Sequence, residues 1–214
     1  MARHFYWILA AILIVSGLLR LSIVDHRLPY LQVVDENSDL SAALRTLEGE
    51  LAPRHYRYHR MLTSNVDLVA VGGLFVFTYV QGEVRSVDDF RDLYFADRAR
   101  FTLATRVLMA GLTVLAIALV AFTGRAIRPE LGILAALALA VNSFFLLNSV
   151  YAMPDTLIMV AVALFLWLAM RVWQRGRWLD YGLMGAGIAF VMLAKISAAP
   201  LGAVFLLAHG ARVY

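Results

Sequence analysis

Long runs of apolar residues divide this chain of 214 residues. A membrane-spanning helix needs about 20 mostly apolar residues, and four of the runs reach or approach that length. Two further runs are shorter. The six runs are residues 5–24, 104–124, 131–151, 156–173, 180–195 and 197–211. This pattern predicts an all-α fold, a polytopic bundle of transmembrane helices.

The first apolar run has one feature of a signal peptide, because Arg3 and His4 precede it. No cleavage site of the small-x-small type follows the run, and further apolar runs do. We therefore interpret residues 5–24 as an uncleaved first span.

Residues 66–82 are also apolar enough to span, but the run is short and polar residues interrupt it. The positive-inside rule helps to decide its role. With a cytoplasmic amino terminus, the arginine-rich loops at 125–128 and 171–177 are both cytoplasmic only if 66–82 does not span. We therefore favour a surface or re-entrant helix at 66–82. Residues 25–100 then form one long external loop that carries juxtamembrane helices.

Composition agrees with a membrane protein. Hydrophobic residues make up 62% of the chain and charged residues only 16%, against roughly 25% in a typical soluble domain. The mean hydropathy is +0.74. These values exclude an ordinary soluble globule and a disordered segment. The absence of cysteine excludes disulfides, thiol catalysis and cysteine-bound zinc.

The net charge of +4 has different meanings in different parts of the chain. Residues 25–100 hold 9 arginines and 12 acids and are net −3, whereas the other 138 residues are net +7. The excess positive charge lies at the ends of apolar runs, which indicates orientation rather than a nucleic-acid partner. We expect an integral protein of the plasma (inner) membrane with a cytoplasmic amino terminus.

Three polar positions are candidates for chemistry. Asp35 and Glu36 are adjacent carboxylates shortly after the first span, where they could act as a general base, bind a cation or simply be solvated. Asp155 opens an apolar run, where a carboxylate costs up to about 2.5–3.5 kcal/mol, although it could also cap the helix. Lys195 is the only lysine among 19 basic residues. It could face a phosphate as a point charge or extend from a helix end towards water.

Other polar groups give weaker signals. Three arginines with helical spacing, at 98, 100 and 106, could meet lipid headgroups or an anionic ligand. His55 and His59 are four residues apart but have no third ligand nearby. We expect no cofactor; a divalent cation is compatible with the sequence but not indicated by it.

The order of these features resembles the membrane glycosyltransferases of the GT-C class. It is most similar to the family of dolichyl-phosphate-mannose protein mannosyltransferases and lipid A aminoarabinose transferases. The similarity covers nearly the whole chain. The motifs that carry it are Asp35-Glu36, Leu47-Glu48-Gly49, residues 53–59, Val87-Asp88-Asp89-Phe90, Ala99-Arg100-Phe101, Thr123-Gly124-Arg125, Asn142-Ser143, residues 151–155, Arg177-Trp178-Leu179 and Ala194-Lys195.

The resemblance implies an integral-membrane enzyme that moves a sugar from a polyprenyl-phosphate donor to an acceptor on the non-cytoplasmic side. The acceptor could be a protein, a lipid or a glycan. By analogy with the family, Asp35 would be the catalytic base with Glu36 beside it, and Asp155 the second external acid. Lys195 would face the donor phosphate. The other substrate-binding positions would be Arg100, Tyr58 and His59. Membrane lipid is the other expected partner, and no nucleic acid is expected.

Some positions depart from the family pattern. Met153 stands where an arginine is usual, and Ala194 replaces the common threonine. Family members continue beyond this length, so we expect this chain to be the amino-terminal portion of a longer enzyme. Two alternatives stay open, a transporter or channel fragment and a non-catalytic membrane assembly subunit.

Overall fold

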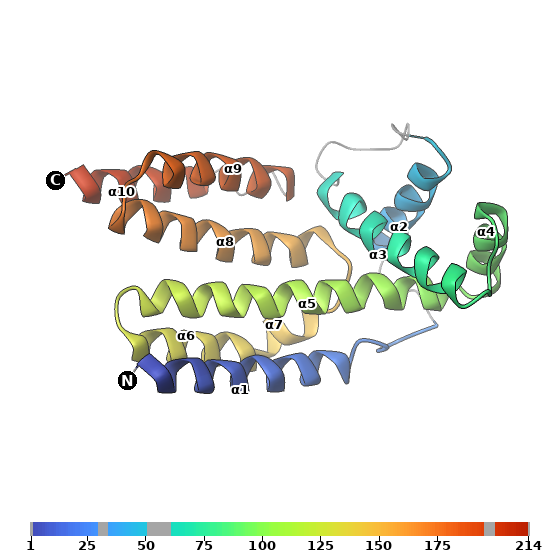
Figure 1. Cartoon of the computed structure of the whole chain (residues 1–214), viewed down its shortest axis with the longest axis horizontal. Coiled ribbons are helices and arrows are strands. Elements are labelled where there is room, and N and C mark those ends of the chain that lie inside the picture. Colours follow the sequence, from blue (N-terminus) through green and yellow to red (C-terminus); the bar gives the residue numbers. More distant parts are fainter. Residues whose placement is uncertain (1, 30–33, 51–60, 195–199, 214) are drawn as a thin grey trace.

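The computed structural model describes residues 2–29, 34–50, 61–194 and 200–213, and every regular element in these ranges is a helix. Figure 1 shows a bundle of helices lying side by side, with the helices between residues 34 and 96 gathered at one end. The all-α membrane bundle predicted from the apolar runs is therefore confirmed.

The bundle is built around one long helix. It consists of α1 (Ala2–Leu21), α5 (Arg98–Arg125), α6 (Pro129–Val141), α7 (Ser143–Asn148), α8 (Pro154–Gln174), α9 (Trp178–Ala194) and α10 (Gly202–Val213). Helix α5 packs against α1, α6 and α8, and α8 packs in turn against α9 and α10. In the described ranges α1, α5 and α8 are long and apolar enough to cross a membrane.

The apolar run at 131–151 is divided into two helices rather than one continuous span. Helix α6 ends at Val141 and α7 begins at Ser143. Between them, the side chain of Asn142 accepts a hydrogen bond of 2.8 Å from the backbone N–H of Phe145. An asparagine at this position satisfies a free N–H group and so favours the start of a new helix. Average hydropathy cannot detect this break, because the residues on both sides are apolar.

In its described residues the polar loop forms three helices at one end of the bundle, α2 (Val34–Leu47), α3 (Met61–Val80) and α4 (Val87–Ala96). Helix α3 is also long and apolar enough to span a membrane, and it packs against α2 and α5. An aromatic cluster joins α3 and α4 to α5. Its ring centroids lie 5.1 Å apart for Phe75 and Phe90, and 4.8 Å apart for Phe90 and Phe101. The loop is thereby attached to the membrane bundle by buried packing.

Two glycines let α5 and α6 approach closely. A Cβ atom on Gly132 of α6 would lie 2.8 Å from the backbone nitrogen of Arg125 and closer still to the carbonyl oxygen of Ala121. A Cβ atom on Gly124 would lie 2.9 Å from the Cα atom of Gly132. Small residues at a helix–helix contact allow this approach in membranes.

We therefore expect Gly132→Ala to destabilise the bundle by about 1–3 kcal/mol, since the added methyl group meets backbone atoms that cannot move away. The thermal midpoint of the detergent-solubilised protein measures the effect. Gly111→Ala on α5 is the matched control, because a Cβ atom there meets nothing within 4 Å. Equal midpoints for the two variants would contradict the close contact.

Candidate functional site

A buried ion pair joins the polar loop to the membrane bundle. Both nitrogens of the Arg106 guanidinium that face Glu36 donate to its carboxylate, Nε to Oε1 at 2.7 Å and Nη2 to Oε2 at 2.8 Å. The two side chains are only 1% and 2% exposed. Two parallel hydrogen bonds between a guanidinium and a carboxylate are both strong and strict in geometry.

Further contacts complete this ion pair. Arg106 Nη1 donates to the carbonyl oxygens of Val24 at 3.2 Å and His26 at 2.8 Å. The guanidinium carbon lies 4.9 Å from the ring centroid of Tyr151. The backbone N–H of Ala152 donates to Glu36 Oε1 at 3.1 Å. The pair therefore connects four parts of the chain: the segment after α1, the start of α2, helix α5 and the turn before α8.

The positions named for acid chemistry lie beside these contacts. Asp35 is the residue before Glu36, in the first turn of α2, and its side chain lies outside the described part of the structure. Asp155 is exposed and lies in the first turn of α8, three residues after Ala152. The residue that caps α8 is Met153, so Asp155 is not the cap itself. A carboxylate in a first turn still interacts favourably with the helix dipole.

The other predicted binding residues are not grouped with the ion pair. Arg100 forms an ion pair of 2.7 Å with Glu83, and both side chains are partly exposed. Tyr58, His59 and Lys195 lie outside the described residues. For these four positions a substrate contact therefore stays a prediction.

A second buried arginine lies in α1, at a position that the apolar pattern did not single out. Arg20, near the end of α1, is fully buried. Its Nε donates to Thr113 Oγ1 at 3.2 Å, its Nη1 donates to Ser16, and its guanidinium lies 5.2 Å from the ring centroid of Phe145. The sequence does contain a signal for this site, an arginine inside an apolar run, because a charge in a membrane-spanning helix needs partners inside the protein.

Helix α3 carries a buried carboxylate, Asp67. It is 0% exposed, and neither of its oxygens has a hydrogen-bond partner among the described residues. The charges of Asp39 and Glu36 on α2 act on it. In the described ranges no group of three histidine, cysteine or acidic residues is placed to hold a metal ion. A buried polar group in this situation costs free energy without compensation from the protein.

We therefore expect Asp67→Leu to raise the thermal midpoint, by an amount equivalent to about 1–3 kcal/mol. Leucine has the same number of side-chain heavy atoms as aspartate but no polar atom, so the substitution removes the buried acidic group next to Asp39 and Glu36 and breaks no hydrogen bond of the described structure. Thermal unfolding in detergent measures the change. A lowered midpoint would show that the carboxylate has a stabilising partner.

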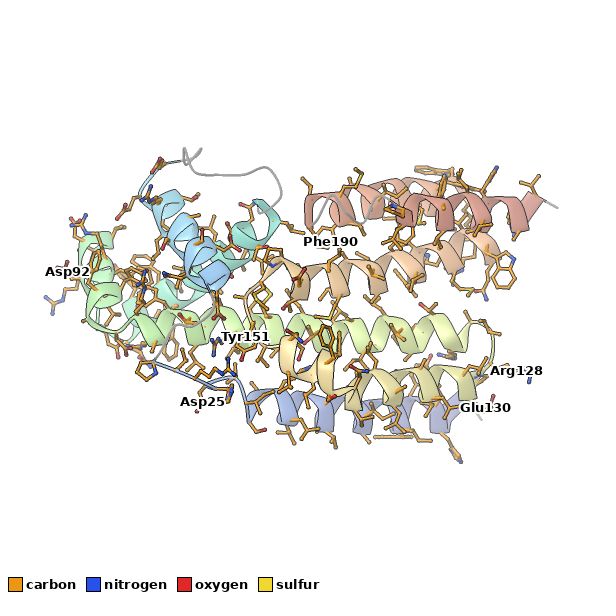
Figure 2. All side chains as sticks on the ribbon, turned by 180° about the vertical axis from the view of Figure 1, so that it is seen from behind. Asp25, Asp92, Arg128, Glu130, Tyr151 and Phe190 are labelled. Atoms are coloured by element: carbon orange, nitrogen blue, oxygen red, sulfur yellow. The ribbon has the colours of Figure 1, made fainter. Side chains whose placement is uncertain are left out.

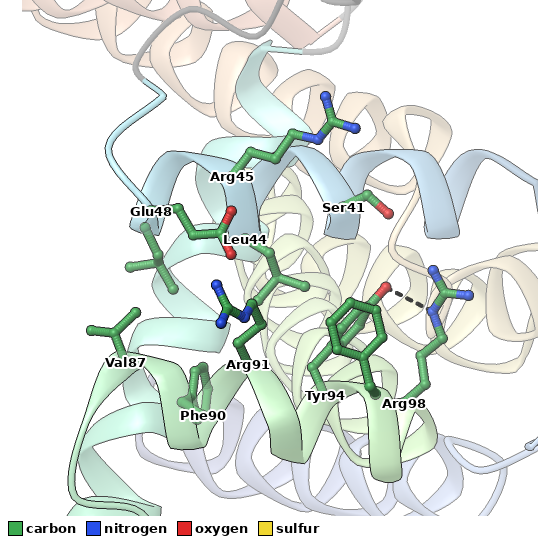
Figure 3. Close-up of a pocket in the computed structure, with 11 residues that line it drawn as sticks. Ser41, Leu44, Arg45, Glu48, Val87, Phe90, Arg91, Tyr94 and Arg98 are labelled. Atoms are coloured by element: carbon green, nitrogen blue, oxygen red, sulfur yellow. Dashed lines mark hydrogen bonds between the residues drawn. The ribbon is translucent and has the colours of Figure 1, made fainter.

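A cavity of about 280 Å³ lies between α2, α4 and the start of α5. Figure 3 shows Leu44 and the ring of Phe90 on its walls, with arginines from all three helices around them. Arg98 Nε donates to the hydroxyl of Tyr94 at 2.7 Å across one side. The loop helices thus form a recess with apolar walls and a mostly basic rim.

Comparison with known proteins gives one finding. Residues 99–213, just over half of the chain, match the model of a family described as dolichyl-phosphate-mannose-protein mannosyltransferase. The match begins at the start of α5 and extends to the end of α10, so it includes Arg106 and Asp155. No curated protein and no solved structure matches the chain significantly.

Proposed function

The chain belongs to the dolichyl-phosphate-mannose-protein mannosyltransferase family of membrane glycosyltransferases, and from this premise we propose that it transfers a sugar from a polyprenyl-phosphate donor to a hydroxyl group of an acceptor. The reaction would take place at the end of the bundle where Glu36 and Arg106 lie. Family membership favours this reaction over the transporter and assembly-subunit alternatives.

One observation carries the proposal. The bond from the Ala152 backbone to Glu36 brings the first turn of α2 against the turn before α8. Asp35 is one residue from one end of this bond, and Asp155 is three residues from the other. The two acids are 120 positions apart in the sequence, but both lie within three residues of the contact between α2 and the turn before α8.

We assign different roles to the two adjacent acids. Both oxygens of Glu36 already accept strong hydrogen bonds from Arg106, so this carboxylate is poorly placed to take a proton from a substrate. Glu36 is therefore a positioning residue that holds the backbone next to Asp35. A general base must reach the proton that it removes, and in this proposal Asp35 is that base.

The proposed reaction needs only the donor, the acceptor hydroxyl and two side chains of the protein. The Asp35 carboxylate accepts the proton of the acceptor hydroxyl, and the hydroxyl oxygen forms a bond to the anomeric carbon of the donor sugar. The bond from that carbon to the phosphate oxygen breaks, and polyprenyl phosphate leaves with the bonding electrons. Lys195 would stabilise the phosphate charge that develops in this step.

A donor turnover assay tests the proposal. The protein, in the form that its host produces, is reconstituted in vesicles with radiolabelled polyprenyl-phosphate mannose and a membrane extract as the source of acceptor. Release of free polyprenyl phosphate together with label in a new product is the expected result. No turnover with mannose, other hexose or pentose donors would reject the proposal.

A further inference from the structure

A second cavity, of about 540 Å³, lies at the other end of the bundle between α1, α5 and α8. Among the described residues its lining includes three arginines, Arg125, Arg171 and Arg175, and no acidic residue. The aromatic residues Tyr6, Phe122 and Trp167 contribute much of the remaining wall. This recess, which we call the basic pocket, takes no part in the proposed sugar transfer.

The length of α5 places the basic pocket at a membrane interface. Arg106 and Arg125 are 19 residues apart on this helix, or about 28 Å at 1.5 Å per residue. The hydrocarbon core of a bilayer is about 30 Å thick. If Arg106 lies near one interface, Arg125 lies near the other. Figure 1 shows the amino terminus of α1 and the carboxyl ends of α5 and α8 at this same end of the bundle.

Two of the arginines in the basic pocket are held in place. The guanidinium carbon of Arg125 lies 4.8 Å from the ring centroid of Phe5 and 4.6 Å from that of Tyr6, and the group donates to the Tyr6 hydroxyl. Arg171 lies 5.0 Å from the Trp167 ring centroid. A cation fixed over aromatic rings needs little further ordering when an anion binds.

The charge of the basic pocket is only partly balanced. Arg171 forms an ion pair of 2.7 Å with the buried carboxylate of Asp180. Arg125 and Arg175 have no ion-pair partner among the described residues, and Arg175 is exposed. Glu130 lies at the same end of the molecule, beside Arg128, but does not line the recess (Figure 2). Two arginines that form no ion pair with a described residue therefore line the pocket next to apolar walls, and the charge of Asp180 acts on one of them, Arg175, from outside the pocket.

We propose that the basic pocket binds the phosphodiester headgroup of an anionic membrane phospholipid. The phosphate would lie between Arg125 and Arg175, and the adjoining part of the lipid would pack against Phe122 and Met170. Guanidinium groups suit phosphate because they donate several hydrogen bonds in one plane. Basic recesses between membrane helices select lipid headgroups in this way. This inference does not depend on the glycosyltransferase reaction.

Lipid titration of the purified protein in neutral detergent tests the proposal. The probe is phosphatidylglycerol with brominated acyl chains, which quenches tryptophan fluorescence. Trp7→Phe, Trp173→Phe and Trp178→Phe leave Trp167, which lines the pocket, as the one tryptophan of the chain and hence the reporter. We expect clearly tighter binding of phosphatidylglycerol than of brominated phosphatidylcholine. Equal affinities for the two lipids would overturn the proposal.

Variants locate the binding site. Each surface arginine contributes about 1 kcal/mol to binding of an anionic lipid surface, which corresponds to about a fivefold change in affinity. We therefore expect Arg175→Gln to weaken phosphatidylglycerol binding about fivefold and Arg175→Lys to weaken it less. Arg125→Gln should act similarly, provided that its thermal midpoint shows a folded protein. Arg175 is exposed, so its variants keep the test valid if Arg125→Gln does not fold.

Arg128→Gln is the matched control, because Arg128 is exposed at the same end of the molecule but does not line the basic pocket. An equal loss of affinity in this control would show a diffuse surface charge and reject the pocket. Competition with inorganic phosphate distinguishes a lipid headgroup from free phosphate as the ligand of the pocket. We expect millimolar phosphate not to displace the lipid, and displacement at such concentrations would show a site for free phosphate instead.

Discussion

Asp35→Asn is expected to lower sugar transfer by at least about 10²-fold, and up to about 10⁴-fold, while the protein still inserts and folds normally. A positioned general base typically contributes a factor in this range. Asparagine has nearly the same size as aspartate but cannot accept the proton. Release of polyprenyl phosphate from the labelled donor measures the loss, and the thermal midpoint measures folding.

The control for this variant is Asp92→Asn. Asp92 is an exposed acid on α4, and Figure 2 shows it at the far end of the loop helices from Arg128. Its substitution changes the charge equally, so it should leave transfer unchanged. A wild-type rate of transfer by Asp35→Asn would contradict the assignment of Asp35 as the general base. An equal loss in both variants would point to a general effect of loop charge.

The apolar pattern predicted the bundle well because burial in lipid depends on average hydropathy over about 20 residues. The same averaging cannot find a single polar residue that ends a helix. Asn142 divides the run at 131–151 through one hydrogen bond to Phe145, and that bond depends on local backbone geometry. Element type was therefore predictable, but the continuity of this element was not.

The arginines at the start of α5 show what sequence spacing leaves out. We grouped Arg98, Arg100 and Arg106 because their spacing is helical, but a helix turns about 100° per residue. Arg100 and Arg106 therefore differ in direction by about 240°, and they have different partners. Arg100 pairs with Glu83, whereas Arg106 pairs with Glu36, which is 70 positions away. Such a distant partner follows only from tertiary packing.

The candidate site was accordingly predictable in part. The acids at positions 35, 36 and 155 stood out because they border apolar runs. The family resemblance pointed to Asp35 as the base, but the sequence could not show that Arg106 occupies both oxygens of Glu36, because that contact depends on tertiary packing. Asp67 is the converse case. In the sequence it is only one of the polar residues that interrupt the run at 66–82, whereas its burial without a hydrogen-bond partner among the described residues follows from the packing of α3.

Arg106→Met is expected to destabilise the protein by about 3–5 kcal/mol, because it leaves the Glu36 carboxylate buried without its partner. Glu36→Gln should have a smaller effect of the same sign, since the neutral amide can keep one acceptor oxygen. Arg106→Lys should not restore stability, because one ammonium group cannot reproduce the paired bonds to Glu36 and reach the carbonyls of Val24 and His26. Thermal midpoints in detergent measure all three.

The double variant Glu36→Leu with Arg106→Met separates stability from positioning. An apolar pair of similar size often replaces a buried ion pair without loss of stability, so the double variant should unfold closer to wild type than Arg106→Met alone. Transfer should nevertheless stay low through a reduced kcat, because the bond from Ala152 to Glu36 is lost and the backbone at Asp35 is no longer held against the turn before α8. Recovery of both stability and kcat would show that the ion pair serves folding alone and that Asp35 acts without it.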